Sequence, residues 1–116
     1  ADEHIQGQEL FNTMYLQVAL RNSMMIGEAP FASHWMYTRN DLLDDGRPAE
    51  RKLGMINGFA WADNADKRVV YVDLGITEGM KKGIDHARRI GQTIWYREIG
   101  FEDTLNQITN LVETET

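Results

Sequence analysis

The segment Arg68–Arg97 constrains the fold most, because it reads as strand, turn, helix and second strand. The run Val69–Leu74 is rich in β-branched residues bounded by glycine, which is typical of a buried strand. The stretch Gln92–Arg97 predicts the next strand. Two consecutive strands joined by a helix usually lie parallel in one sheet. The segment therefore predicts an α/β fold.

The helix between these strands has recognisable ends. Gly75 permits a tight turn after the first strand, and Thr77 is a favourable N-cap residue. Gly91 ends the helix as a C′ glycine. Apolar residues recur at helical spacing and predict one buried face; they are Met80, Ile84, Ala87 and Ile90.

Three other segments carry the periodicity of amphipathic helices, namely Gln8–Met25, Pro48 to Trp61 or Ala62, and Phe101–Val112. The short aromatic run Phe31–Tyr37 predicts a buried strand, and Thr38–Arg47 predicts a polar loop.

In the helix that begins at Pro48, the spacing of Leu53, Ile56 and Ala60 predicts a buried stripe. Gly54 and Gly58 on the same helix would permit close approach of a neighbouring element.

Composition narrows the classes of function. A chain of 116 residues is predicted to be a single domain, 1–116. The formal net charge of −6, with scattered basic residues, argues against a nucleic-acid partner.

No apolar run approaches the roughly 20 residues of a membrane span, and the polar N-terminus does not resemble a signal peptide. We therefore expect a cytoplasmic protein without a membrane partner. The absence of cysteine excludes disulfides and thiol chemistry.

The turn from Asp73 to Gly79 is the first candidate site. Backbone N–H groups at a helix start suit a phosphate, and a carboxylate at a strand end can bind ribose hydroxyls. The competing interpretation has equal weight: Thr77 caps the helix and Asp73 stabilises the turn. His34 is more often a hydrogen-bonded structural histidine than a ligand-binding residue, and Tyr37 could stack on a base.

Carboxylates supply the only candidate catalytic groups. Paired carboxylates cleave glycosidic bonds when one is protonated and the other ionised, and Asp45, Glu50 and Glu78 are the candidates. For each of them a solvated surface position is the more common role. No metal-ligand spacing such as HExxH occurs, and we expect neither a metal nor a cofactor.

Three stretches together resemble the nucleoside 2-deoxyribosyltransferase-like family, and more closely its bacterial and phage branch. They are GEAPFASHWMYT (Gly27–Thr38), LLDDGRPAERKLGMINGFAWA (Leu42–Ala62) and VVYVDLGITEGMKKGIDHARRIGQTIWY (Val69–Tyr96). The resemblance implies a flavodoxin-like three-layer sandwich that binds a nucleoside or nucleotide. The resemblance assigns six residues to the ligand or its pocket: Asp73, Thr77, Gly79, His34, Asp45 and Glu50. We add Gly75 of the turn and the aromatic residue Tyr37 to the predicted ligand-binding residues.

The chain departs from that family at two places. The family's glutamate nucleophile corresponds by spacing to Gly83, which cannot attack an anomeric carbon. The family's first, central strand has no counterpart here. Residues upstream of Ala1, or another chain, would have to fill its place, and the missing initiator methionine favours the first explanation. The resemblance also implies a homo-oligomer.

Three functions follow as hypotheses. The leading one is a nucleoside- or nucleotide-binding protein that sequesters or senses a nucleotide with a degenerate transferase-type site. The second is an active N-glycosidase, either a transferase or a hydrolase. The third is a phage protein-interaction module that inhibits a host protein.

Overall fold

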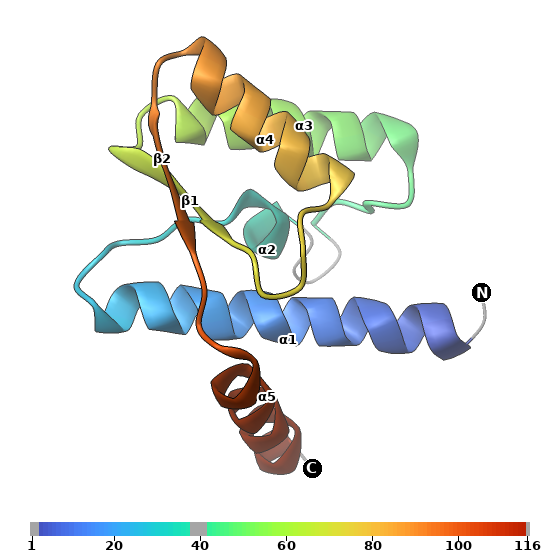
Figure 1. Cartoon of the computed structure of the whole chain (residues 1–116). Helices are drawn as coiled ribbons and strands as arrows, with labels where there is room; N and C mark the ends of the chain where they lie inside the picture. The colour runs from blue at the N-terminus through green and yellow to red at the C-terminus, as the bar shows by residue number, and fades with distance from the viewer. Residues whose placement is uncertain (1–2, 38–41, 116) are drawn as a thin grey trace. The chain divides into compact units, whose positions relative to one another are not determined.

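The computed structural model describes residues 3–37 and 42–115, which form an α/β structure with a parallel two-stranded sheet (Figure 1). This confirms the predicted class and strand direction. The described helices and strands are α1 (Glu3–Met25), α2 (Ser33–Tyr37), α3 (Pro48–Ala62), β1 (Lys67–Tyr71), α4 (Glu78–Arg89), β2 (Thr93–Arg97) and α5 (Phe101–Glu115).

The chain divides into two compact units. Unit 1 combines Ala1–Phe31 with Ile99–Thr116, and unit 2 is the continuous segment Ala32–Glu98. Unit 2 contains the sheet and the segment that the sequence singled out.

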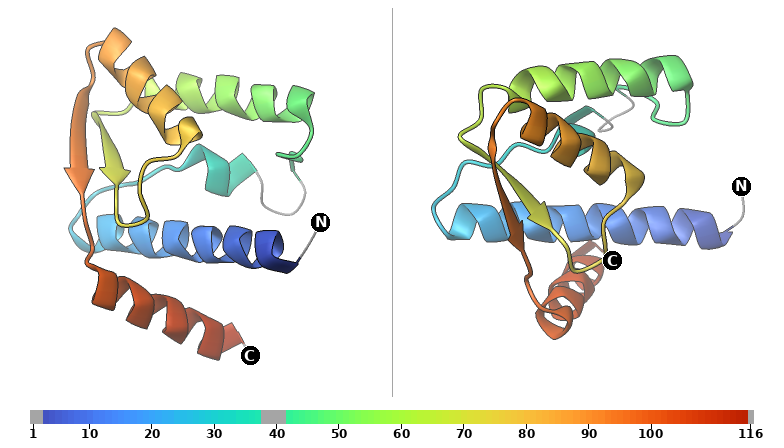
Figure 2. Two further views of the ribbon diagram at one scale, coloured as in Figure 1. Left: turned by 45° about the vertical axis from the view of Figure 1, so that its right-hand side comes forward. Right: turned by 45° about the horizontal axis from the view of Figure 1, so that its top comes forward.

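In unit 2, β1 and β2 lie side by side in parallel, with Lys67 opposite Thr93 and Tyr71 opposite Arg97 (Figure 2). Helix α4 connects them and packs against the sheet, because the apolar side of α4 is buried as predicted at Ile84 and Ala87. Ile90 belongs to the predicted stripe but is exposed, since it lies at the C-cap beyond the last full turn.

The predicted strand Phe31–Tyr37 is wrong, because Ser33–Tyr37 forms the short helix α2. The N–H of Met36 donates to the carbonyl of Ala32, which is a helical hydrogen bond. Helix α2 packs on α3 at Gly58, where an added Cβ would lie 2.7 Å from the hydroxyl oxygen of Ser33. The aromatic content of the run suggested a strand, whereas this tertiary contact accommodates a helix.

Helix α3 has the predicted bounds, but the predicted buried stripe is wrong. Leu53, Ile56 and Ala60 are exposed, and Gly58 is the buried residue of the helix. Because α2 contacts the glycine-containing side, the apolar stripe on the opposite side faces away from that contact.

The C-terminal end of α3 is tied to α4 and to the start of β2. The side-chain amide of Gln92 donates to the carbonyls of Ala62 and Ala65, at 2.8 and 3.0 Å. The ring of His86 lies 2.6 Å from a carboxylate oxygen of Asp63 and stacks on Phe59. His86 therefore contributes to the packing of α3 against α4.

In unit 1, α1 and α5 contact each other. The predicted helices Gln8–Met25 and Phe101–Val112 are confirmed in type, and both are longer than predicted. The side chain of Val18 on α1 is 1% exposed, and Ile108 on α5 is also buried. In the part of the chain that the structure describes, every helix is too short or too polar to cross a bilayer.

Candidate functional site

The start of α4 has the cap that the sequence predicts. The hydroxyl oxygen of Thr77 accepts a hydrogen bond from the N–H of Met80 at 3.2 Å, and the Thr77 N–H lies 3.4 Å from the Met80 sulfur. The capping role of Thr77 is therefore confirmed. The N–H groups of Glu78 and Gly79 are left for solvent or a ligand, because the first turn of a helix cannot satisfy them.

The loop before α4 continues from the carboxyl end of β1. The Val72 N–H still bonds the Arg97 carbonyl, and Gly75 then closes a turn on Val72 with a φ of 88°. This positive φ favours glycine. Asp73 is half-buried in the turn, whereas Gly75, Thr77 and Gly79 are exposed.

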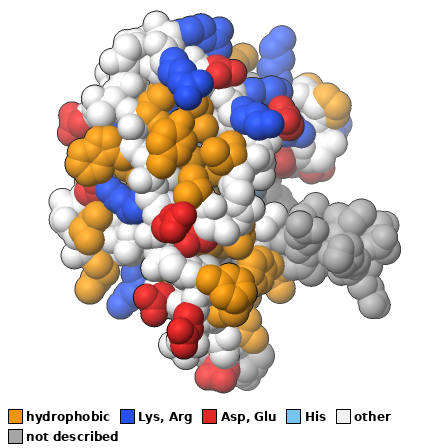
Figure 3. Space-filling model, viewed as in Figure 1, with side chains coloured by type: hydrophobic (Ala, Val, Ile, Leu, Met, Phe, Trp, Pro, Cys, Tyr) orange, Lys and Arg blue, Asp and Glu red, His pale blue; other side chains and the backbone are white. Residues whose placement is uncertain are grey.

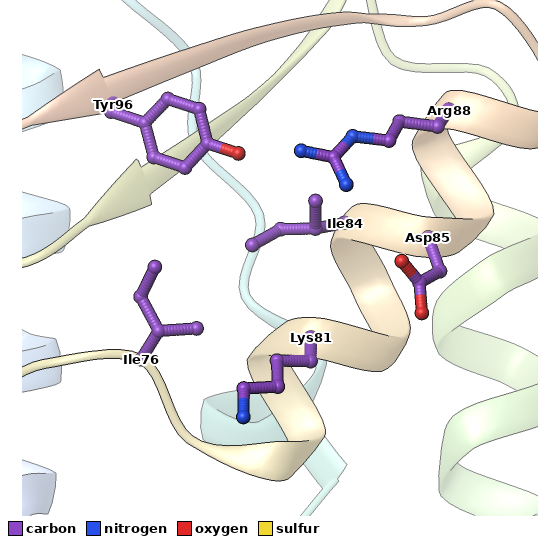
Figure 4. Close-up of a pocket in the computed structure, with 6 residues that line it drawn as sticks. All are labelled: Ile76, Lys81, Ile84, Asp85, Arg88 and Tyr96. Carbon is purple, nitrogen blue, oxygen red and sulfur yellow. The ribbon is translucent and has the colours of Figure 1, made fainter.

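A hollow of about 200 Å³ lies beside this loop, between α4 and the edge strand β2 (Figure 4). Figure 4 shows Tyr96 of β2 and Arg88 of α4 pointing toward each other across Ile84. Figure 3 shows hydrophobic side chains with lysine and arginine side chains around them in the same region of α4 and β2. The residues that line the hollow are Ile76, Lys81, Ile84, Asp85, Arg88 and Tyr96.

The hollow combines cationic, aromatic and apolar groups. The Lys81 ammonium pairs with the exposed carboxylate of Glu78 at 3.1 Å. The Arg88 guanidinium has no hydrogen-bond or ion-pair partner among the described residues. The carboxylate of Asp85 lies on α4 between these two cations. Such a set can bind an anion with an attached ring. The two cations can pair with the negative charge of the ligand, and the exposed Tyr96 ring offers a stacking surface.

A third cation, Arg68 of β1, lies on the side of the sheet that α4 covers, next to Gly83. An added Cβ at Gly83 would lie 2.7 Å from Nη1 of Arg68, and the Arg68 Nε is buried without a partner. Burial lowers the pKa of the Arg68 guanidinium below its usual value. The missing side chain at Gly83 thus makes room for the arginine on β1.

The structure places the other predicted site residues on separate elements. His34 and Tyr37 lie in α2, and Asp45 is exposed in the loop before α3. Glu50 lies in the first turn of α3, where its carboxylate pairs with Arg47 at 3.3 Å and accepts from the Asp44 N–H. Only the Asp73–Gly79 loop borders the hollow, through Ile76.

The sequence predictions missed the lining of the hollow. The sequence predicts Tyr96 only as part of a strand, and it does not single out Lys81 or Arg88 as site residues. The signal was the spacing of Lys81, Ile84, Asp85 and Arg88, which places them on one side of a helix.

Candidate metal ligands do not gather in the part of the chain described. Among these residues, no group of three or more histidine, cysteine, aspartate or glutamate side chains could hold an ion.

One known family model matches most of the chain. The model of a domain of unknown function, DUF7768, matches residues 4–97. The chain belongs to the DUF7768 family. The DUF7768 match runs from α1 to the end of β2, so it includes the loop before α4 and the hollow. No curated protein and no solved structure matches the chain.

Proposed function

We propose that the chain binds a nucleoside monophosphate in the hollow beside α4, and that it sequesters or senses this ligand without cleaving it. One observation carries the proposal: the Arg88 guanidinium, without a partner among the described residues, points toward the hydroxyl end of Tyr96 above the apolar side chain of Ile84. A phosphate on Arg88 and Lys81, with the base on Tyr96, matches this arrangement. Asp85 is available to accept hydrogen bonds from ribose hydroxyls.

The loop before α4 supports the same ligand class. The N–H groups of Glu78 and Gly79 lie at the positive end of the helix, next to Lys81. The end of the hollow formed by Ile76 and Lys81 lies next to the carboxyl end of β1, where ligands commonly bind in parallel sheets. On this proposal, β1–α4–β2 is part of a flavodoxin-like three-layer sandwich, as the resemblance to the deoxyribosyltransferase-like family implies.

Binding without catalysis is favoured by the positions of the carboxylates. Glycosidic cleavage needs a carboxyl group held protonated by its surroundings beside an ionised one. Glu78 is largely exposed and paired with Lys81, and Glu50 is paired with Arg47. Gly83 supplies no nucleophile. The degenerate site therefore retains charge and ring recognition but lacks the usual reactive group.

Calorimetric titration of the full chain with nucleosides, their 5′-monophosphates and inorganic phosphate tests the proposal. We expect the monophosphates to bind about tenfold tighter than the nucleosides, since a partly exposed charged hydrogen bond contributes about 1.4 kcal/mol. Phosphate alone should bind more weakly than the nucleotides. Absence of binding across the panel would reject the proposal, and equal affinity for phosphate and nucleotides would reject the base-binding role of Tyr96.

A further inference from the structure

The outer side of α3 carries a stripe that contains exposed apolar side chains. Leu53 is 48% exposed, and Ile56 and Trp61 are each 55% exposed. Leu53 and Ile56 lie on the side of α3 away from Gly58 and α2. Asn57 and Trp61 lie at the edge of that side, closer to Gly58 around the helix. We define the outer stripe of α3 as Leu53, Ile56, Asn57, Ala60, Trp61 and Asn64.

Part of the outer stripe is hollowed in a way that suits another helix. A depression of about 240 Å³ is lined by Asn57, Ala60, Trp61 and Asn64. Their spacing is i, i+3, i+4 and i+7, which is the four-residue hole that receives one side chain when two helices pack by knobs into holes. Leu53, one turn before Asn57 on the same stripe, is an exposed apolar side chain of suitable size.

We propose that α3 pairs antiparallel with α3 of a second copy of this chain, around a two-fold axis near Asn57. Leu53 lies as far before Asn57 as Trp61 lies after it. In such a pair, Leu53 of each copy therefore enters the hole beside Trp61 of the other. A two-fold pair uses the same surface twice, so one stripe that contains both knob and hole is sufficient.

The charges flanking the stripe fit this pairing. Lys52 and Asp63 lie about three helical turns apart and therefore on the same flank of α3. They lie on either side of Asn57 at nearly equal distance, so the two-fold axis brings Lys52 of one copy next to Asp63 of the other. Lys52 has no ion-pair partner among the described residues, and the Asp63 side chain is 51% exposed although it contacts His86. In a parallel two-fold pair, Lys52 and Asp63 of the two copies would lie on opposite sides of the interface, and this charge pairing would be lost.

The absence of cysteine from the chain permits a direct test with Asn57→Cys. With helix axes 8–10 Å apart, two facing Cα atoms on the axis are separated by about 3.5–5.5 Å, within reach of a disulfide. We expect Asn57→Cys to form a disulfide-linked dimer under mild oxidation much faster than Lys82→Cys, an exposed control on α4. Equal rates for the two variants would overturn the proposal.

Sedimentation of the full chain from low-micromolar to near-millimolar concentration supplies the second readout. We expect reversible dimerisation of the wild type, and loss of at least tenfold in association constant for Leu53→Glu. Ile90→Glu, at an exposed apolar residue outside the stripe, should leave dimerisation unchanged. A wild type that stays monomeric throughout, or a Leu53→Glu variant that associates like the wild type, would overturn the proposal.

Discussion

Replacing Gly58 by alanine is expected to lower the free energy of unfolding of the chain by about 1–2 kcal/mol. The added Cβ would lie 2.7 Å from the Ser33 hydroxyl oxygen and 2.8 Å from the Ser33 Cβ. The Cβ of Ser33 is fixed to the backbone of α2, so α2 and α3 must move apart to accommodate the added Cβ of residue 58. Such overpacking costs about 1–3 kcal/mol, of which the better helix propensity of alanine returns up to about 1 kcal/mol.

Gly54→Ala is the matched control on the same helix. Its Cβ would meet only the Leu43 Cδ1 at 3.4 Å, which is ordinary van der Waals contact. Here the propensity gain of about 0.5–1 kcal/mol should remain, so this variant should be more stable than the wild type. Urea denaturation followed by circular dichroism measures both changes. A Gly58→Ala variant as stable as Gly54→Ala would contradict the described contact between α2 and α3.

Arg88→Ala is expected to weaken nucleoside monophosphate binding about tenfold, because it removes the hollow's unpaired guanidinium and with it about 1.4 kcal/mol. Lys81→Ala should have a smaller effect, since the Lys81 ammonium is exposed and already paired with Glu78.

The helix offers a matched control beside each of these cations. Lys82 and Arg89 are exposed and adjacent in sequence, but neither lines the hollow. Lys82→Ala and Arg89→Ala should therefore retain wild-type affinity in the same calorimetric titration. Equal losses for Arg88→Ala and Arg89→Ala would indicate a general effect of net charge and would contradict a phosphate contact at Arg88.

The strand–helix–strand segment could be predicted from the sequence because its signals are local. Gly75, the Thr77 cap and Gly91 mark the ends of the helix within a few residues, and the β-branched run of β1 needs no tertiary information. For the same reason the start of α3 at Pro48 was predicted correctly.

The prediction failed where a tertiary contact decides between two local possibilities. Helix α3 has apolar or small residues on two sides, and periodicity selected the side of Leu53 and Ile56. The contact between Gly58 and Ser33 makes the other side the packed one. The same contact accommodates Ser33–Tyr37 as a helix, although its aromatic residues favour a strand.

The candidate site was predicted in part. The loop Asp73–Gly79 borders the hollow, but its opposite wall comes from Tyr96 of β2. Ile76 and Tyr96 are far apart in the sequence. The parallel pairing of β1 with β2 brings them together, because it places Val70 opposite Tyr96. Periodicity identifies the side of α4 that carries Lys81 and Arg88, but only the register identifies the aromatic partner.

The most direct test of nucleotide binding beside α4 is to follow the backbone amide resonances of the isotope-labelled chain during titration with a nucleoside 5′-monophosphate. Binding in the hollow predicts the largest shifts at Ile76, Glu78, Gly79, Lys81 and Tyr96, with saturation at one ligand per chain. Shifts centred on α3 or on the helices of unit 1, or unchanged spectra at high ligand concentration, would contradict it.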